Sequence, residues 1–112
     1  MKATIYHNPL CSNSRAALEI LRARGVETEV IEYQKTPLTR DQLAALVAKL
    51  GVPARDILRW KEKAAEGLKS DAPESALLDA MAAHPVLMNR PIVVTDKGAK
   101  LCRPGETVLE LL

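Results

Sequence analysis

The hydrophobic and polar positions at the start of the chain follow two different spacings in turn. Residues 3–6 are a short β-prone run, and residues 14–24 place apolar side chains at helical spacing before Gly25, a residue type that often ends helices. Residues 27–33 alternate in character and predict a second strand. A strand, a helix and a strand in this order favour a parallel pair of strands joined by a right-handed crossover.

The middle of the chain is dominated by helical patterns. Thr39 and Gln42 have the spacing of a capping box, in which each side chain bonds the main chain of the other residue. Apolar residues then follow at helical spacing, namely Leu43, Leu46, Val47 and Leu50. Residues 53–58 predict a short helix, and residues 73–83 predict a longer one that stops before Pro85.

The end of the chain returns to strands. Residues 92–94 are β-branched and predict a buried strand, residues 96–98 predict a turn, and residues 99–102 predict a strand that pairs back as a hairpin. Pro104 suits the first turn of a last helix. We therefore expect an α/β fold with a thioredoxin-like, four-stranded mixed sheet. An all-helical insertion of about residues 36–85 would separate its βαβ and ββα halves.

Composition narrows the class of protein. The 112 residues are 47% hydrophobic, which suits a single domain over residues 1–112 with one core. A net charge of +2 is too small to indicate a surface that binds nucleic acid. No window approaches the roughly 18 apolar residues that span a bilayer, and no secretory signal is visible. We expect a cytoplasmic monomer with no membrane or nucleic-acid partner, whose two cysteines form no disulfide scaffold.

Cys11 is the main candidate for chemistry, because it falls in the predicted loop between the first strand and the first helix. A thiol at a helix N-terminus faces unpaired main-chain N–H groups that favour its anionic, reactive form. Ser14 stands where a Cys-x-x-Cys pair would have its second thiol. Cys11 is therefore expected to pass its adduct to an external thiol. An isolated cysteine is more often a small buried hydrophobe, and that alternative stays open.

Polar neighbours of Cys11 have two interpretations each. His7 either holds positive charge near the thiolate or orients a hydroxyl group, and it equally suits the plain end of a strand. Ser12, Asn13 and Ser14 form a candidate anion loop, although helix capping alone explains those residue types.

Three arginines are candidates for stabilising an oxyanion that a thiolate attacks, since a guanidinium is always charged and offers several donors. Arg59 follows an apolar pair, Arg90 precedes Pro91 at a strand entry, and Arg103 stands at the start of the last helix. Taken singly, each also suits a solvated surface charge. Thioredoxin-like folds carry a cis-proline beside the reactive cysteine. That likeness predicts a cis Arg90-Pro91 bond and places Arg90 near Cys11.

These residues resemble the glutaredoxin-coupled arsenate reductases over essentially the full chain. Four blocks carry the resemblance: His7-Asn8-Pro9-x-Cys11-x-x-Ser14-Arg15, Leu58-Arg59, residues 84–94, and Leu101-Cys102-Arg103-Pro104. The resemblance implies that Cys11 attacks arsenate to form a thioarsenate adduct, which glutathione and glutaredoxin resolve to release arsenite. It implies oxyanion binding by Arg59, Arg90 and Arg103, and thiol tuning by His7. Glutathione would be a co-substrate, with no bound cofactor.

The chain departs from the better-known members at Ser12-Asn13, where they carry Gly-Thr, so it is similar to a sister subgroup. A phosphatase-like reductase needs an arginine at position 17, which here is Ala17. A redox regulator of the same fold typically uses a Cys-x-x-Cys switch, which Ser14 interrupts. A glutathione-binding protein without reductase activity is the other alternative. His7, Cys11, His84 and Cys102 lack metal-ligand spacing.

Overall fold

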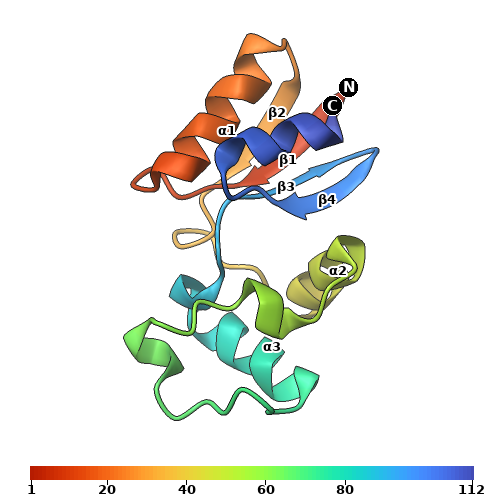
Figure 1. The fold of residues 1–112 in the computed structure, drawn as a ribbon. Helices are drawn as coiled ribbons and strands as arrows, with labels where there is room; N and C mark the ends of the chain where they lie inside the picture. The colour runs from red at the N-terminus through yellow and green to blue at the C-terminus, as the bar shows by residue number, and fades with distance from the viewer. The chain divides into compact units, whose positions relative to one another are not determined.

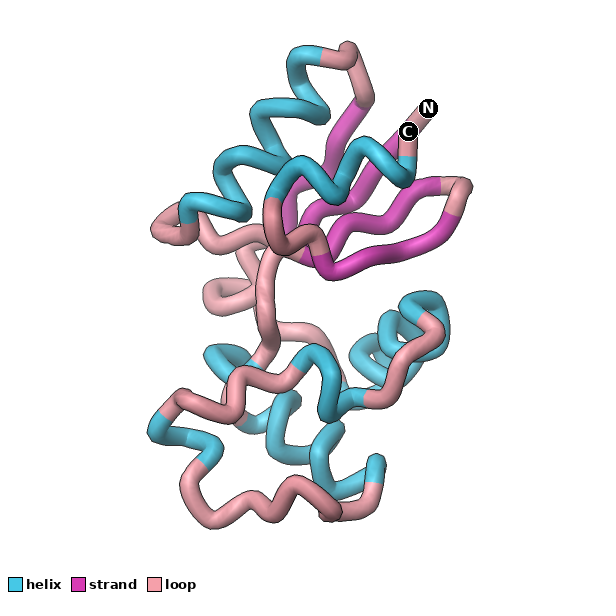
Figure 2. The backbone as a smooth tube through the Cα atoms, viewed as in Figure 1, coloured by secondary structure: helices cyan, strands magenta, loops and turns pink.

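The computed structural model describes residues 1–112, which divide into two compact units. The first unit comprises Met1–Thr36 and Arg90–Leu112, and the second comprises Pro37–Asn89. The first unit holds every strand and the C-terminal 3-10 helix, and the second is helical (Figures 1 and 2). Each unit is described by itself below.

The first unit is built on one four-stranded sheet. Its elements are β1 (Lys2–Tyr6), α1 (Ser12–Ala23), β2 (Glu27–Ile31), β3 (Ile92–Thr95), β4 (Gly98–Leu101) and the 3-10 helix η4 (Gly105–Leu111). The strand order is β2-β1-β3-β4. β1 runs parallel to β2 and antiparallel to β3, and β3 pairs antiparallel with β4. The predicted mixed sheet and the predicted parallel first pair are therefore confirmed.

The core of the first unit lies between the sheet and one helical layer. Figure 1 shows α1 and η4 side by side across the strands, and they make many contacts with each other. Side chains from the sheet and both helices form one buried cluster: Ala3, Ile5, Ala17, Leu18, Leu21, Val93, Cys102, Val108 and Leu111. Burying these apolar side chains supplies most of the stability of such a layer. The same layer fixes the N-terminal end of α1, where Cys11 lies.

The second unit contains α2 (Arg40–Leu50) and α3 (Glu74–Ala83), joined by short 3-10 turns. The capping box of Thr39 and Gln42 is confirmed, because each side chain bonds the main chain of the other residue. The two helices contact each other, and each buries apolar side chains, among them Leu43 on α2 and Leu77 on α3. The predicted short helix at 53–58 is a 3-10 turn, Ala54–Ile57.

Several boundaries differ from the sequence predictions, including the end of β2 at Ile31. Helix α1 begins at Ser12 rather than Ser14, because Cys11 itself takes the N-cap position. Strand β4 begins at Gly98, so the hairpin turn is shorter than predicted. The last helix is a 3-10 helix, and Pro104 is its N-cap.

Both X-Pro bonds next to the candidate arginines are cis, namely Arg90-Pro91 and Arg103-Pro104. The first was predicted, and the second was not. No helix of the structure combines the length and the apolar character that crossing a membrane requires.

Candidate active site around Cys11

Cys11 lies at the junction between β1 and α1. Its extended backbone, with φ −94° and ψ 124°, is the N-cap conformation, and its carbonyl accepts the first helical hydrogen bond from the Arg15 N–H at 3.0 Å. The residue is 8% exposed, so it is largely covered by its neighbours. The side chain of an N-cap residue faces the free N–H groups of the first turn. The thiol of Cys11 is therefore close to the main-chain N–H groups of Asn13 and Ser14.

Two arginines from a distant part of the chain reach the same sulfur. Nη1 of Arg103 donates to Sγ of Cys11 across 3.5 Å and to the carbonyl oxygen of Arg90 across 3.0 Å. The side chain of Arg90 also acts on the thiol, because it lowers the pKa of Cys11. The structure therefore assembles Cys11, Arg90 and Arg103 into one cluster within the first unit.

Close packing of η4 on α1 brings the Arg103 segment to the cysteine. The N–H of Gly105 donates to Oδ1 of Asn13 at 3.3 Å. A Cβ on Gly105 would lie 2.7 Å from the main-chain oxygen of Asn13, which is a closer approach than ordinary contact permits. The absence of a side chain on Gly105 thus allows this approach, and Arg103 is only two residues before it.

Several groups act on the pKa of the Cys11 thiol in opposite directions. Burial of the sulfur raises the pKa, because it removes water from the charged form. The main-chain N–H of Ser14, the Arg90 side chain, the N–H of Asn13 and the Arg103 side chain each lower it, in that order. The sum is a pKa below the ordinary value of a cysteine. The site therefore favours a thiolate, which is the nucleophilic form.

Ser14 and His7 form a buried pair behind the reactive loop. The Ser14 side chain is fully buried, and its Oγ lies 2.6 Å from Nδ1 of His7, with which it shares a hydrogen bond. The Asn8 N–H donates to the same oxygen at 3.0 Å. Burial, together with the nearby cations Arg22 and Arg15, lowers the pKa of His7, and Glu32 opposes them. A neutral His7 therefore orients the Ser14 hydroxyl.

The candidate anion loop divides into three different environments. Ser12 is exposed, Asn13 is half-buried against Gly105, and Ser14 is buried against His7. None of the three caps α1 through its side chain, so the capping interpretation was wrong. The physical reason is that the helix starts two residues early, and the N-cap position belongs to Cys11. Their main-chain N–H groups, rather than their side chains, are what this loop offers to an anion.

Asn8 shapes the reactive loop, although the sequence analysis did not select it as a site residue. Its Oδ1 accepts from the Leu10 N–H at 2.9 Å, and its carbonyl accepts from the Cys11 N–H at 3.0 Å. The signal was present, since Asn followed by Pro9 is a typical turn-forming pair. Asn8 thus fixes the turn that presents Cys11.

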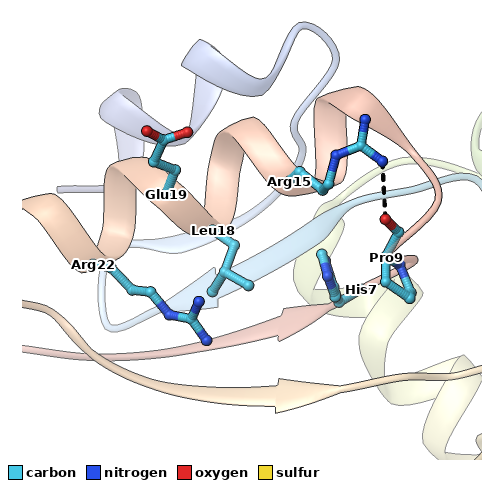
Figure 3. Close-up of a pocket in the computed structure, with 6 residues that line it drawn as sticks. All are labelled: His7, Pro9, Arg15, Leu18, Glu19 and Arg22. Carbon is cyan, nitrogen blue, oxygen red and sulfur yellow. Dashed lines mark hydrogen bonds between the residues drawn. The ribbon is translucent and has the colours of Figure 1, made fainter.

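A groove of about 420 Å³ runs beside the loop along α1 (Figure 3). It is lined by His7, Pro9, Arg15, Leu18, Glu19 and Arg22, and Cys11 is not among these residues. Figure 3 shows the Arg15 guanidinium donating to the Pro9 carbonyl oxygen, across 2.9 Å. Arg15 therefore stabilises the loop that precedes Cys11.

Arg59 belongs to the second unit and is described there alone. Its N–H donates to the Leu87 carbonyl at 2.8 Å, next to an isolated antiparallel bridge between Leu58 and Met88. Its guanidinium pairs with the carboxylate of Glu62. The main chain of Arg59 is thus fixed to the segment that leads, along the chain, into Arg90.

Cys102 occupies an environment unlike that of Cys11. It is fully buried in the core cluster, and desolvation raises its pKa to about 12. Its thiol is therefore protonated and inaccessible at neutral pH. The structure also brings no three His, Cys, Asp or Glu side chains together as a metal site.

The comparisons with known proteins agree with one another. Residues 6–111 match the model of the ArsC family. The chain is 49% identical to an arsenate reductase of Escherichia coli strain K12, over 97% of this chain and 79% of that protein. It is 44% identical to an arsenate reductase of Rhizobium meliloti, over 100% of this chain and 82% of that protein. The solved structure of an arsenate reductase from Vibrio cholerae is similar, with a TM-score of 0.94 and 41% identity, and covers 100% of this chain and 98% of that one.

Proposed function

The chain belongs to the ArsC family, and from that premise we propose that it is an arsenate reductase that draws its electrons from glutathione and glutaredoxin. The observation that carries the proposal is the Cys11 sulfur at the N-terminus of α1, with a lowered pKa and with Nη1 of Arg103 at 3.5 Å. The names of the similar proteins support the same substrate.

The first step is an attack of the Cys11 thiolate on the arsenic of arsenate. A sulfur–arsenic bond forms, and one arsenate oxygen leaves as water after protonation. The second step uses an external thiol, glutathione, whose sulfur bonds with that of Cys11 while arsenic takes up two electrons and departs as arsenite. One disulfide replaces two thiols, so atoms and electrons balance. Glutaredoxin with further glutathione then reduces that mixed disulfide and restores the thiolate.

The arginines have an electrostatic task in this scheme. A thiolate and an oxyanion repel each other, and charge develops on the arsenate oxygens as the bond forms. Arg90 and Arg103, which already lie at the sulfur, would hold those oxygens, and Arg59 would supply a third guanidinium. The main-chain N–H groups at the start of α1 add fixed positive dipoles. These donors need no reorganisation during the reaction.

The need for an external thiol follows from the surroundings of Cys11. Ser14 stands at the Cys-x-x-Ser position and is bonded to His7, so no second thiol lies within the loop. Cys102 is protonated inside the core. Both cysteines are free thiols, which suits a reducing compartment such as the cytoplasm.

The test is a coupled assay on the purified protein with arsenate, glutathione and glutaredoxin, in which arsenite release is measured. We expect turnover in the wild type, none in Cys11→Ser, and most of the activity in Cys102→Ser. Equal activity in the two variants would refute the proposal. Turnover that does not depend on arsenate would instead favour a general glutathione-dependent thiol reductase.

A further inference from the structure

The Asn13 side chain joins the two helical elements that carry the reactive groups of the first unit. Its Oδ1 accepts from the Gly105 N–H at 3.3 Å, although 92 positions of sequence separate the two residues. Asn13 lies in the first turn of α1, two residues after Cys11. Gly105 is the first residue of η4, two residues after Arg103. One hydrogen bond therefore links the segment of the nucleophile to the segment of an arginine that reaches it.

The start of η4 has no capping side chain of its own. Its N-cap is Pro104, which offers no side-chain acceptor to the free N–H groups of the first turn. Oδ1 of Asn13 supplies an acceptor from α1 instead. Gly105 is buried, and a main-chain N–H that is shielded from water and lacks an acceptor is unfavourable. The hydrogen bond therefore favours the position of η4 in which Gly105 lies at Asn13.

The two elements also approach each other too closely for a side chain at position 105. A Cβ on Gly105 would lie 2.7 Å from the main-chain oxygen of Asn13 and 2.9 Å from the Cβ of Ala16. Both distances are shorter than ordinary contacts of a Cβ atom. The position of η4 on α1 thus depends on two features at one point, the Asn13 amide and the missing side chain of Gly105. Mutation can change each feature separately.

Arg103 lies between two anchored neighbours. Cys102, before it, is fully buried in the core, and Gly105, after it, is held by Asn13. Arg103 itself is exposed, so packing of its own side chain does not fix the guanidinium. The position of its main chain therefore decides where the guanidinium can reach. A small displacement of this segment would lengthen the 3.5 Å contact between Nη1 and the Cys11 sulfur.

We propose that Asn13 is a positioning residue, whose side-chain amide holds the segment of Arg103 against α1 so that the guanidinium reaches the Cys11 sulfur. The Asn13 amide acts through Gly105 and Arg103. The effect on the thiol does not depend on arsenate. Only its consequence for turnover rests on the proposed function.

The main chain and the side chain of Asn13 have different effects on the thiol. The Asn13 N–H lowers the pKa of Cys11 directly, and substitution of the side chain leaves that N–H in place. The Arg103 side chain lowers the same pKa. Loss of the Asn13 amide should therefore raise the pKa of Cys11 only through displacement of Arg103. Once Arg103 is absent, loss of the amide should change nothing further.

The experiment measures the pH midpoint of Cys11 alkylation by iodoacetamide, together with the thermal midpoint, in wild type, Asn13→Ala, Arg103→Ala and the double variant. We expect a higher alkylation midpoint in Asn13→Ala, by an amount no larger than in Arg103→Ala. The double variant should show no further rise, because the two residues act as one unit. Gln34→Ala, which removes an exposed amide elsewhere in the first unit, is the control and should match wild type.

Gly105→Ala displaces the same segment while the Asn13 amide stays in place. The added Cβ would press on the main-chain oxygen of Asn13, so η4 must shift. The alkylation midpoint of Cys11 should rise in this variant as well. A folded Gly105→Ala protein with an unchanged midpoint would contradict the link between the position of η4 and the thiol. Should this variant fail to fold, Asn13→Ala with and without Arg103 decides the question.

Turnover with arsenate gives a third measurement. Removal of Arg103 should lower kcat/KM about a hundredfold, as for the loss of one charged donor. Asn13→Ala displaces that donor without removing it, so a smaller loss of about tenfold is expected.

The outcomes separate the two levels of inference. An unchanged alkylation midpoint in Asn13→Ala, or a rise that persists in the Arg103→Ala background, would overturn the positioning role. A lower thermal midpoint of Asn13→Ala without a change in alkylation would show a purely structural contact and would also overturn it. Absence of arsenate turnover in the wild type would refute the proposed function, and the alkylation result would still decide the role of Asn13.

Discussion

Nη1 of Arg103 lies 3.5 Å from Sγ of Cys11, although 92 positions of sequence separate the two residues. The same nitrogen donates to the carbonyl oxygen of Arg90, so the guanidinium is held from two sides. A guanidinium keeps its charge at every physiological pH. The sulfur therefore meets a permanent cation that only the folded chain provides.

The reactivity of the two thiols should differ with pH. Because the pKa of Cys11 is lowered, its alkylation by iodoacetamide should reach a plateau at lower pH than that of a free cysteine peptide. Cys102, whose pKa is raised to about 12, should stay unmodified in the native protein throughout the same range. Peptide mass spectrometry of partly alkylated wild-type protein measures both sites in one sample. An ordinary alkaline midpoint for Cys11 would contradict the thiolate assignment.

Substituting either arginine at the sulfur should slow arsenate reduction. Arg103→Ala or Arg90→Ala removes a donor that acts mainly as charge develops, and kcat/KM should fall about a hundredfold. The pKa of Cys11 should rise in each variant, because both side chains lower it. Arg103→Lys should recover only part of the rate, since an ammonium lacks the planar donor set.

The control for this prediction is Arg24→Ala at the exposed C-cap of α1, which removes the same charge far along the helix. Steady-state kinetics and the pH dependence of alkylation provide the two readouts. If Arg24→Ala matched the Arg103 variant, general charge rather than local geometry would explain the effect.

Ser14→Ala should destabilise the protein and disturb the reactive loop. The substitution leaves Nδ1 of His7 and the N–H of Asn8 without the oxygen they share, of which the first is buried and the second part-buried. Leaving buried polar groups unsatisfied costs about 1–3 kcal/mol of unfolding free energy. Urea denaturation of Ser14→Ala beside Ser12→Ala, an exposed neighbour, measures the difference. Equal stability of the two variants would show that the shared oxygen contributes little.

Cys102 should make the protein less stable in alkali. Its pKa is about 12 when folded and roughly 8.5 when unfolded, so the unfolded chain loses this proton first. The stability that the protonated Cys102 thiol contributes is complete below the pKa of the unfolded chain. It is lost as the pH rises from that value towards 12, the pKa of the folded protein. In Cys102→Ala the unfolding free energy should therefore fall less steeply with rising pH, by up to about 1.4 kcal/mol per pH unit.

Urea denaturation between pH 7 and 10.5, with a reductant present, gives the slope for wild type and variant. The variant is expected to be less stable at pH 7, because it leaves a small cavity in the core. Only the difference in slope tests the titration, and parallel curves would contradict it.

Local patterns in the sequence were sufficient for most elements of the fold. The capping box of Thr39 and Gln42 and the helical spacing after it define α2, because capping and amphipathic spacing act within one or two turns. The β-branched run at Ile92–Thr95 defines a buried strand in the same way. The start of α1 could not be placed correctly, since no local rule shows that a cysteine occupies the N-cap.

The sequence by itself determined that Cys11 lies at a strand-to-helix turn with Ser14, not a second thiol, after it. Only the tertiary structure decided that Arg90 and Arg103 reach the sulfur, and that His7 serves the Ser14 hydroxyl rather than the thiol. It also decided that Cys102 is buried. The physical reason is distance along the chain. Capping and turn formation depend on neighbours in sequence, whereas the charge and burial around a side chain depend on whatever the completed sheet and helices bring beside it.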